Sequence, residues 1–294
     1  MEWVELILNV GDPDLADEIA ALLVDAGGIA AQGAHVRGGE VVIWAPAPEA
    51  TAAADAMRAE VARLAEAGLA VDPANVTTRP APPESEWRDA WKKFFHVKRV
   101  TKSIVIVPSW ETYAAQPGDV VLDLDPGRAF GTGAHASTRL CLVELEQLRA
   151  EGLMPKTWLD VGTGSGILAV AAAKLWPSST GVAMDDDPQA VDYAHENLEK
   201  NHVTDRVRTT TDVLDVIGGA HQLVLANIQA DVLLMLRDAL CARVAPGGSL
   251  VLAGLLTAQG DPVATAFEQA GLRRVRLTEL DDDHDWIAVV LRRA

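Results

Sequence analysis

Short apolar runs and longer amphipathic segments alternate along the second half of this chain. Strands are expected at 157–161, 180–184, 206–210, 222–226 and 249–253, and helices at 167–175, 188–201, 231–243 and 258–270. This alternation predicts a parallel, doubly wound α/β sheet. Two last runs, 272–279 and 286–291, face each other across three aspartates and predict a hairpin, so that one strand runs antiparallel.

The first 78 residues follow a different pattern. Strands are expected at 3–9 and 76–78, helices at 12–26 and 49–67, and a hairpin formed by 29–36 and 40–44. The order βαββαβ predicts a small α+β domain of the ferredoxin-like type. No residue pattern in it indicates catalysis. We therefore interpret it as a binding module, whose partner the fold alone does not identify.

A proline-rich segment separates these two parts. Residues 79–84 read RPAPPE, which is typical of an extended, semi-rigid linker. Four aromatic residues then crowd into 87–96. They indicate either a helix that docks on the second domain or a hinge that touches substrate or cofactor. We expect a ferredoxin-like domain at 1–78, a linker at 79–100 and a larger α/β domain at 101–294, which the motifs below indicate to be the S-adenosylmethionine-dependent domain.

The first strand of the predicted doubly wound sheet ends in three glycines at alternate positions, Gly162, Gly164 and Gly166. Glycine lets the backbone approach a ligand closely, and the amides at the start of the next helix point at that ligand. A dinucleotide-binding loop, G-x-G-x-x-G, would need a glycine where Ile167 stands. The observed D-x-G-x-G-x-G instead resembles the S-adenosylmethionine loop of seven-stranded methyltransferases.

Polar residues end two later strands, where ligands of parallel sheets bind. Asp185 ends the next strand and is placed to bind both hydroxyls of a ribose, whereas Asp186 and Asp187 are interpreted as a solvated loop and a helix cap. Asn227 follows a buried strand. It can donate and accept hydrogen bonds beside the transferring methyl group, or it can cap the following helix. In the methyltransferase fold, Asp212 would contact adenine, or it is a plain loop acid.

A second glycine-rich motif, DPGRAFGTGAH at 125–135, precedes a helix that carries Thr138 in its first turn. Since it lies just upstream of the first glycine loop, we expect it to form a lid over the cofactor. His135 is a possible proton acceptor or a residue that hydrogen-bonds the backbone. No residue must act as a base, so the sequence assigns no catalytic residue.

Composition narrows the class of protein. A chain of 294 residues suggests two domains. Its net charge of −17 disfavours binding to nucleic acid or to an anionic membrane and favours binding of a basic substrate. Alternatively, the charge only keeps the protein soluble. Two cysteines give no disulfide framework, which indicates a reducing cytoplasm. The first ten residues lack signal-peptide features. No apolar run reaches the length of a membrane span. The seven histidines show no metal-ligand spacing, so we predict no metal.

The segments LDPGRAFGTGAHASTRLCL, LDVGTGSGILAVAAAKL, DDDPQAVDYAHENLEKN and LANIQADVL resemble the PrmA-type ribosomal protein methyltransferases. The resemblance covers most of 85–294. It implies S-adenosyl-L-methionine as cofactor and trimethylation of amino groups on the large-subunit protein numbered eleven. It also implies a substrate-recognition role for the N-terminal domain. The implied cofactor contacts are Phe130 near the methionine or adenine moiety, Thr138, Gly162, Gly164, Asp185 and Asn227.

Some positions depart from the family pattern. Where the family usually has Thr-His-Pro, this chain has Ala134-His135-Ala136, which bears on whether the usual substrate is retained. We expect a cytoplasmic monomer acting on a free, basic ribosomal protein. One alternative is a methyltransferase that acts on another protein, a small amine or RNA. The negative net charge argues against RNA, because binding to phosphates requires basic patches. Another alternative is a non-catalytic module that binds the cofactor. The presence of the glycine loop together with Asp185 and Asn227 argues against it.

Overall fold

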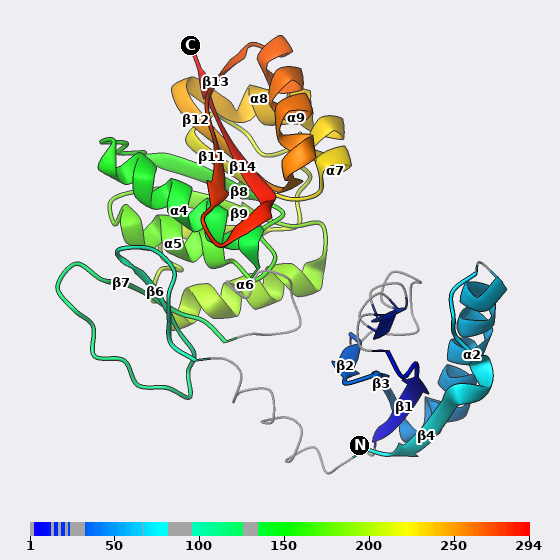
Figure 1. The fold of residues 1–294 in the computed structure, drawn as a ribbon. Coiled ribbons are helices and arrows are strands. Elements are labelled where there is room, and N and C mark those ends of the chain that lie inside the picture. Colours follow the sequence, from blue (N-terminus) through cyan, green and yellow to red (C-terminus); the bar gives the residue numbers. More distant parts are fainter. Residues whose placement is uncertain are drawn as a thin grey trace. The chain divides into compact units, whose positions relative to one another are not determined.

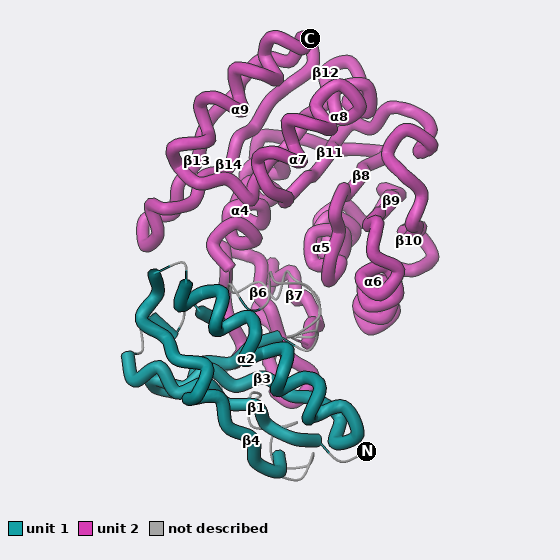
Figure 2. Tube along the Cα trace, turned by 90° about the vertical axis from the view of Figure 1, so that its right-hand side faces the viewer, with its two compact units in different colours: residues 1–94 teal, residues 95–294 magenta. Residues whose placement is uncertain are grey.

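The computed structural model (Figure 1) describes residues 3–12, 15–16, 19–20, 23, 33–66, 68–81, 96–125 and 135–294. The chain divides into two compact units, Met1–Phe94 and Phe95–Ala294, drawn in different colours in Figure 2. Each unit has its own hydrophobic core. None of the helices within the described ranges is long and apolar enough to cross a membrane.

Unit 1 is built on an antiparallel four-stranded sheet in the order β2-β3-β1-β4. The helix α2 packs on this sheet through Met57, Val61 and Leu64, whose spacing puts them on one helical face. The described residues at 15–16, 19–20 and 23 are also helical. The order is that of a ferredoxin-like domain, as predicted. The elements are β1 (Trp3–Asn9), β2 (His35–Arg37), β3 (Glu40–Pro46), η1 (Ala47–Glu49), α2 (Ala50–Glu66), η2 (Pro73–Asn75) and β4 (Val76–Pro80).

Both ends of the segment 79–100 carry strand structure. Arg79 and Pro80 continue β4 and pair with β1, and the amide of Ala81 donates to Trp3 O. At the other end, β5 (Lys98–Arg99) pairs with β6 (Ile104–Val107). The residues from 82 to 95, which include the aromatic segment, lie outside the described residues.

Unit 2 contains a seven-stranded sheet in the order β10-β9-β8-β11-β12-β14-β13, so the predicted α/β class is confirmed. Only β14 runs against its neighbours, as the predicted closing hairpin requires. The strands are β8 (Thr157–Val161), β9 (Thr180–Met184), β10 (Val207–Thr210), β11 (His221–Asn227), β12 (Val244–Leu256), β13 (Leu272–Leu280) and β14 (Asp283–Arg293).

Helices cover both faces of this sheet (Figure 1). The core on one face contains residues of α4, α5 and α6, and the core on the other contains residues of α7, α8 and α9. The single helix predicted at 231–243 is two short helices, because the backbone at Leu236 leaves helical geometry. The helices are α4 (Ala136–Ala150), α5 (Ile167–Leu175), α6 (Pro188–Lys200), α7 (Ala230–Met235), α8 (Arg237–Arg243) and α9 (Thr257–Gln269).

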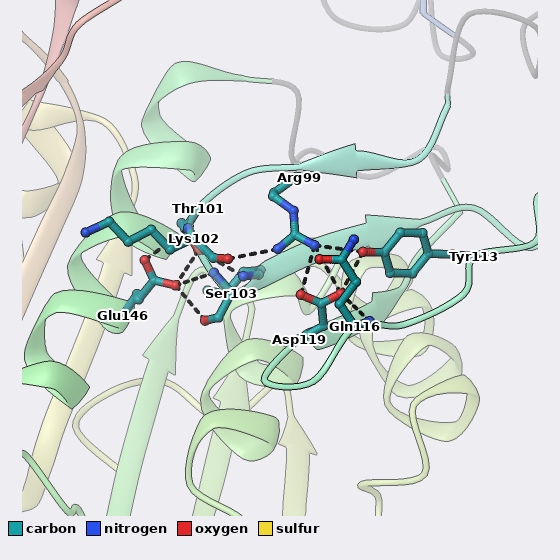
Figure 3. A network of polar contacts seen from close by, with 9 residues as sticks. Arg99, Thr101, Lys102, Ser103, Tyr113, Gln116, Asp119 and Glu146 are labelled. Atoms are coloured by element: carbon teal, nitrogen blue, oxygen red, sulfur yellow. Dashed lines mark hydrogen bonds and ion pairs between the residues drawn. The ribbon is translucent and has the colours of Figure 1, made fainter.

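A small separate sheet, β5-β6-β7, opens unit 2, with β7 (Val120–Asp123) parallel to β6. The turn between β5 and β6 is held by Glu146 of α4 (Figure 3). This carboxylate accepts hydrogen bonds from Thr101 Oγ1 at 2.7 Å, Ser103 N at 2.7 Å and Lys102 N at 3.2 Å. The start of unit 2 is therefore tied to the helix that also enters the candidate site.

Candidate active site

The glycine loop leaves β8 with positive φ at Gly162 (69°), Gly164 (52°) and Gly166 (77°). This left-handed conformation favours glycine over any residue with a side chain. A Cβ at Gly162 would also lie 2.4 Å from Ile228 Cγ2, which shows how closely the loop packs against the end of β11. The loop is fixed from outside by Asn197 of α6, whose Nδ2 donates to Ser165 O at 2.8 Å.

Asp160 lies beneath this loop and is 1% exposed. Its Oδ2 accepts a hydrogen bond from Thr163 Oγ1 at 2.6 Å, so it braces the loop from within. Burial raises the pKa of the Asp160 carboxyl to about 7; the Thr163 hydrogen bond opposes this rise and the nearby Asp185 charge adds to it. The sequence motif alone does not assign a role to Asp160, because a motif position does not reveal how deeply a side chain is buried.

Asp185 lies directly after β9, within reach of the glycine loop. Its Oδ2 accepts from Gly164 N at 2.8 Å, and its Oδ1 accepts from Asp187 N at 3.2 Å. Two carboxylate oxygens offer more acceptor sites than these two donors use, so the group has capacity left for ligand hydroxyls. Asp187 caps α6 by accepting from Gln189 N at 2.9 Å, and Asp186 is exposed. Asp185 therefore lies at the glycine loop, whereas Asp186 is a solvated loop residue and Asp187 is a helix cap, as the sequence indicated.

Asn227 is the last residue of β11, and its side chain points toward α4. Its Nδ2 donates to Thr138 Oγ1 at 3.3 Å, which joins two of the predicted cofactor residues from distant parts of the sequence. Its Oδ1 is buried and has no hydrogen-bond partner among the described residues. Buried acceptors are rarely left unpaired in native proteins, so this oxygen is suited to a ligand donor. The helix-cap alternative is wrong, because Gln229 is the N-cap of α7.

His135 forms the N-cap of α4. Its Nδ1 accepts from Ser137 N at 3.3 Å, and its ring meets the indole of Trp286 edge-on with centroids 4.5 Å apart. Partial burial lowers the pKa of His135, although the charge of Asp283 acts in the opposite direction. The His135 ring therefore supports the start of α4 and contacts Trp286, which matches the alternative in which His135 hydrogen-bonds the backbone.

The predicted lid motif is described only at its two ends. Asp125 Oδ1 accepts from Ser109 N at 2.7 Å and Oδ2 pairs with Lys200 Nζ at 3.1 Å, while the hydroxyl of Tyr193 donates to its backbone carbonyl. Partial burial opposes ionisation of Asp125, but the Ser109 and Lys200 contacts hold its pKa below the ordinary value. Phe130 lies outside the described residues, so its predicted cofactor contact stays a prediction.

Asp212 lies just beyond β10 and is exposed. Its carboxylate pairs with Arg208 Nη1 at 3.1 Å. The Thr210 hydroxyl and this guanidinium lower its pKa. These contacts are typical of an acidic residue in a surface loop, and they give no support to a contact with adenine.

The predicted site residues that the structure describes lie near the carboxyl ends of the parallel strands. The glycine loop and Asp185 lie at β8 and β9, and Thr138 and Asn227 meet where α4 covers β11. The sequence model for the family described as Ribosomal protein L11 methyltransferase (PrmA) matches residues 7–294. This chain belongs to that family.

Individual relatives agree with this membership. A ribosomal protein L11 methyltransferase of Geobacter sp. (strain M21) is 43% identical over 211 residues, which cover 71% of this chain and 67% of that protein. One from Chloroflexus aurantiacus is 41% identical over 235 residues, 71% of this chain and 70% of that protein. Among solved structures, the ribosomal protein L11 methylase of Lactobacillus delbrueckii subsp. bulgaricus gives a TM-score of 0.61 at 30% identity, covering 68% of this chain and all of that one.

Proposed function

We propose that this methyltransferase transfers methyl groups from S-adenosyl-L-methionine to lysine or N-terminal amino groups of ribosomal protein L11. The observation that carries the proposal is the contact between Asn227 and Thr138, with a buried, unsatisfied Asn227 Oδ1 at the same edge of the sheet as Asp185. The names of the relatives support the choice of substrate.

The residues present fit this cofactor. The backbone around Gly162 and Gly164 would approach its methionine part, Asp185 would accept from its ribose hydroxyls, and Thr138 with Asn227 would lie on the side of the methyl acceptor. When bound, S-adenosyl-L-methionine supplies an electrophilic methyl group on a sulfonium centre. The task of the protein is then mainly to align the acceptor amine with that group and to exclude water.

The acceptor amine must be unprotonated when it reacts, whereas a free lysine is protonated at neutral pH. Transfer of the amine from water into a partly buried site lowers its pKa, because burial disfavours the charged form. Asn227 Oδ1, which is buried and has no partner among the described residues, would accept an N–H bond from the amine there. No general base is needed if the ammonium proton leaves to water, which agrees with the engagement of His135 Nδ1 in the helix cap.

The substrate proposal also rests on charge. The chain carries a formal net charge of −17, and a basic ribosomal protein would be attracted to it. We propose that residues 1–78 recognise this substrate. The departure at Ala136 leaves the start of α4 intact, because alanine is a good helix former in the first helical position, where the family usually has proline.

The test is incubation of the full chain with S-adenosyl-L-methionine and purified ribosomal protein L11 from the same organism, followed by intact-mass and peptide mass spectrometry. We expect one or more added methyl groups on amino groups. Asn227→Ala should lower transfer at least tenfold, and Asp187→Asn should change it little. Cofactor binding without any modification of L11 would refute the substrate, and absence of cofactor binding by calorimetry would refute the proposal as a whole.

A further inference from the structure

Strand β7 is an outer strand of the small sheet β5-β6-β7 within the described residues. The main-chain groups on the outer edge of such a strand are not paired with another strand. Here, side chains of two helices bind that backbone instead. Lys174 of α5 donates to Val121 O at 2.6 Å. At the end of the strand, the hydroxyl of Tyr193 of α6 donates to Asp125 O.

Asn201, at the end of α6, makes the most complete of these contacts. Its Oδ1 accepts from Asp123 N at 2.9 Å, and its Nδ2 donates to Asp123 O at 2.7 Å. One side-chain amide thus pairs with both main-chain groups of a single residue, as a neighbouring antiparallel strand would. Asn201 is only 4% exposed, so these bonds are shielded from water.

The same side chain also leads back to the glycine loop. Asn201 Nδ2 donates to Asn197 O at 2.8 Å, one helical turn earlier. Asn197 is fully buried, and its own Nδ2 binds Ser165 O in the loop. The helix touches the loop sterically as well, because a Cβ at Gly166 would lie 3.0 Å from Ala194 Cα. One buried face of α6 therefore contacts both the glycine loop and β7.

Packing alone does not call for two amides on this buried face. A buried polar side chain costs stability unless it is hydrogen-bonded, whereas an apolar residue fills the same space without that cost. What Asn197 and Asn201 add is a set of bonds to main-chain groups outside their own helix. Lys200 extends the set, because its Nζ binds the carboxylate of Asp125, where the second glycine motif begins, at 3.1 Å.

We propose that Asn201 is a positioning residue for the cofactor, which fixes β7 and, through Asn197, the glycine loop in the relative placement that binds S-adenosyl-L-methionine. The inference rests on the proposed function, since the glycine loop is taken to hold that cofactor. Asn201 acts through Asn197 and Asp123 rather than by contact with the cofactor. The hydrogen-bonding groups of Asn201, and not its bulk, therefore set its effect on cofactor affinity.

The first test measures S-adenosylmethionine binding by calorimetry on the full chain. Asn201→Leu keeps a side chain of similar size and removes all three hydrogen bonds. It should weaken cofactor binding by about threefold to thirtyfold. Binding of ribosomal protein L11 to the cofactor-free enzyme should change less than about twofold, because residues 1–78 are proposed to recognise L11. An equal loss of both affinities, or no loss of either, would overturn the inference.

A second variant separates hydrogen bonding from packing. Asn201→Asp has nearly the shape of the wild type, but its ionised carboxylate has lost both donors. Burial raises the pKa of a carboxyl, and the protonated form regains one donor. Relative to the wild type at the same pH, cofactor affinity of Asn201→Asp should therefore recover in part between pH 8 and pH 5.5. Asn201→Leu should show no recovery, and a recovery equal in both variants would refute the role of the amide.

A double-mutant cycle tests the path through Asn197. If the two asparagines act in series, the loss of cofactor affinity in the double variant Asn197→Ala, Asn201→Ala should be smaller than the product of the two single losses. Single losses that multiply would show that Asn201 does not act through Asn197.

Phe267→Leu is the control for general destabilisation, because Phe267 is fully buried on α9 in the core of the opposite sheet face. It should lower thermal stability and leave cofactor affinity unchanged. Hydrogen exchange should become faster at 162–168 in Asn201→Leu, with little change across α9. Equal weakening of cofactor binding by Phe267→Leu would overturn the inference. A wild type that does not bind S-adenosylmethionine refutes the proposed function as well, whereas a wild type and Asn201 variants that bind it equally refute this inference alone.

Discussion

At the scale of single residues, Asp185 and Asp187 have different neighbours although they are two positions apart. Asp185 reaches Gly164 N, while Asp187 caps α6. Charge-assisted hydrogen bonds contribute about 1.5–3 kcal/mol, so Asp185→Ala should weaken S-adenosylmethionine binding on the order of tenfold to a hundredfold. Calorimetry on the folded variants measures this.

Asp187→Ala is the control for that measurement. Loss of its cap should cost about 0.5–2 kcal/mol of stability, seen in thermal unfolding, with nearly unchanged cofactor affinity. Equal effects of the two substitutions on affinity would show that the ribose binds elsewhere.

Asp160 gives a pH-dependent prediction. Its pKa rises from 3.8 to about 7 in the fold, so between these values the folded state holds a proton that the unfolded state has released. Its contribution to stability therefore falls as pH rises through this window and is constant above it. Asp160→Asn, which cannot ionise, should become more stable relative to wild type from pH 4 to 7.

From the two pKa values of Asp160, 3.8 and about 7, the free energy of unfolding of Asp160→Asn should rise relative to wild type by roughly 4 kcal/mol at most across this pH range. Denaturant unfolding of both proteins at several pH values gives the comparison. A stability difference that does not vary between pH 4 and 7 would contradict a raised pKa at Asp160.

At the scale of elements, α4 connects much of unit 2. Glu146 on this helix holds the turn between β5 and β6, and Glu144 binds Arg276 Nε of β13 at 2.8 Å. Partial burial of Glu146 opposes ionisation, but hydrogen bonds from Ser103, Thr101 and Lys102 keep its pKa below 4.5. Its contribution to stability is present above the unfolded value and is lost as pH falls through the folded value.

Glu146→Ala should therefore destabilise the protein at pH 7 by about 1–3 kcal/mol, because four backbone or hydroxyl donors lose their acceptor. The loss should shrink as the pH is lowered below 4.5. Gln147→Ala, at the next and exposed position of the same helix, should have little effect at either pH. Unfolding curves at pH 7 and pH 4 test this, and a loss independent of pH would exclude the carboxylate as its cause.

At the scale of the whole molecule, the two compact units give the proposed division of labour a direct test. A truncated chain that begins at Pro82 should still bind S-adenosylmethionine, since the described site residues all belong to unit 2. It should lose nearly all transfer to ribosomal protein L11, because remote contacts position the amine. Calorimetry and mass spectrometry measure the two properties. Full transfer would refute the recognition role, and an insoluble product would indicate that unit 1 is needed for folding.

The sequence by itself determined most of the elements of the seven-stranded sheet and their order, although it predicted one helix where α7 and α8 stand. The closing hairpin and the glycine loop could be predicted because apolar periodicity and glycine spacing are local properties of the chain. The sequence also placed Asp185 at a strand end, since the carboxyl ends of parallel strands meet at one edge. It did not predict the separate β5-β6-β7 sheet, whose strands gather only through pairing in space.

Only the tertiary structure decided which side chains meet. Thr138 and Asn227 are 89 positions apart, and their contact depends on how α4 crosses β11. Gly181 was one residue of a predicted strand, yet a Cβ there would lie 2.2 Å from the Trp158 ring in the paired strand. The burial of Asp160 likewise follows from packing. Such contacts join elements far apart in the chain, and no local pattern of hydrophobic and polar residues encodes them.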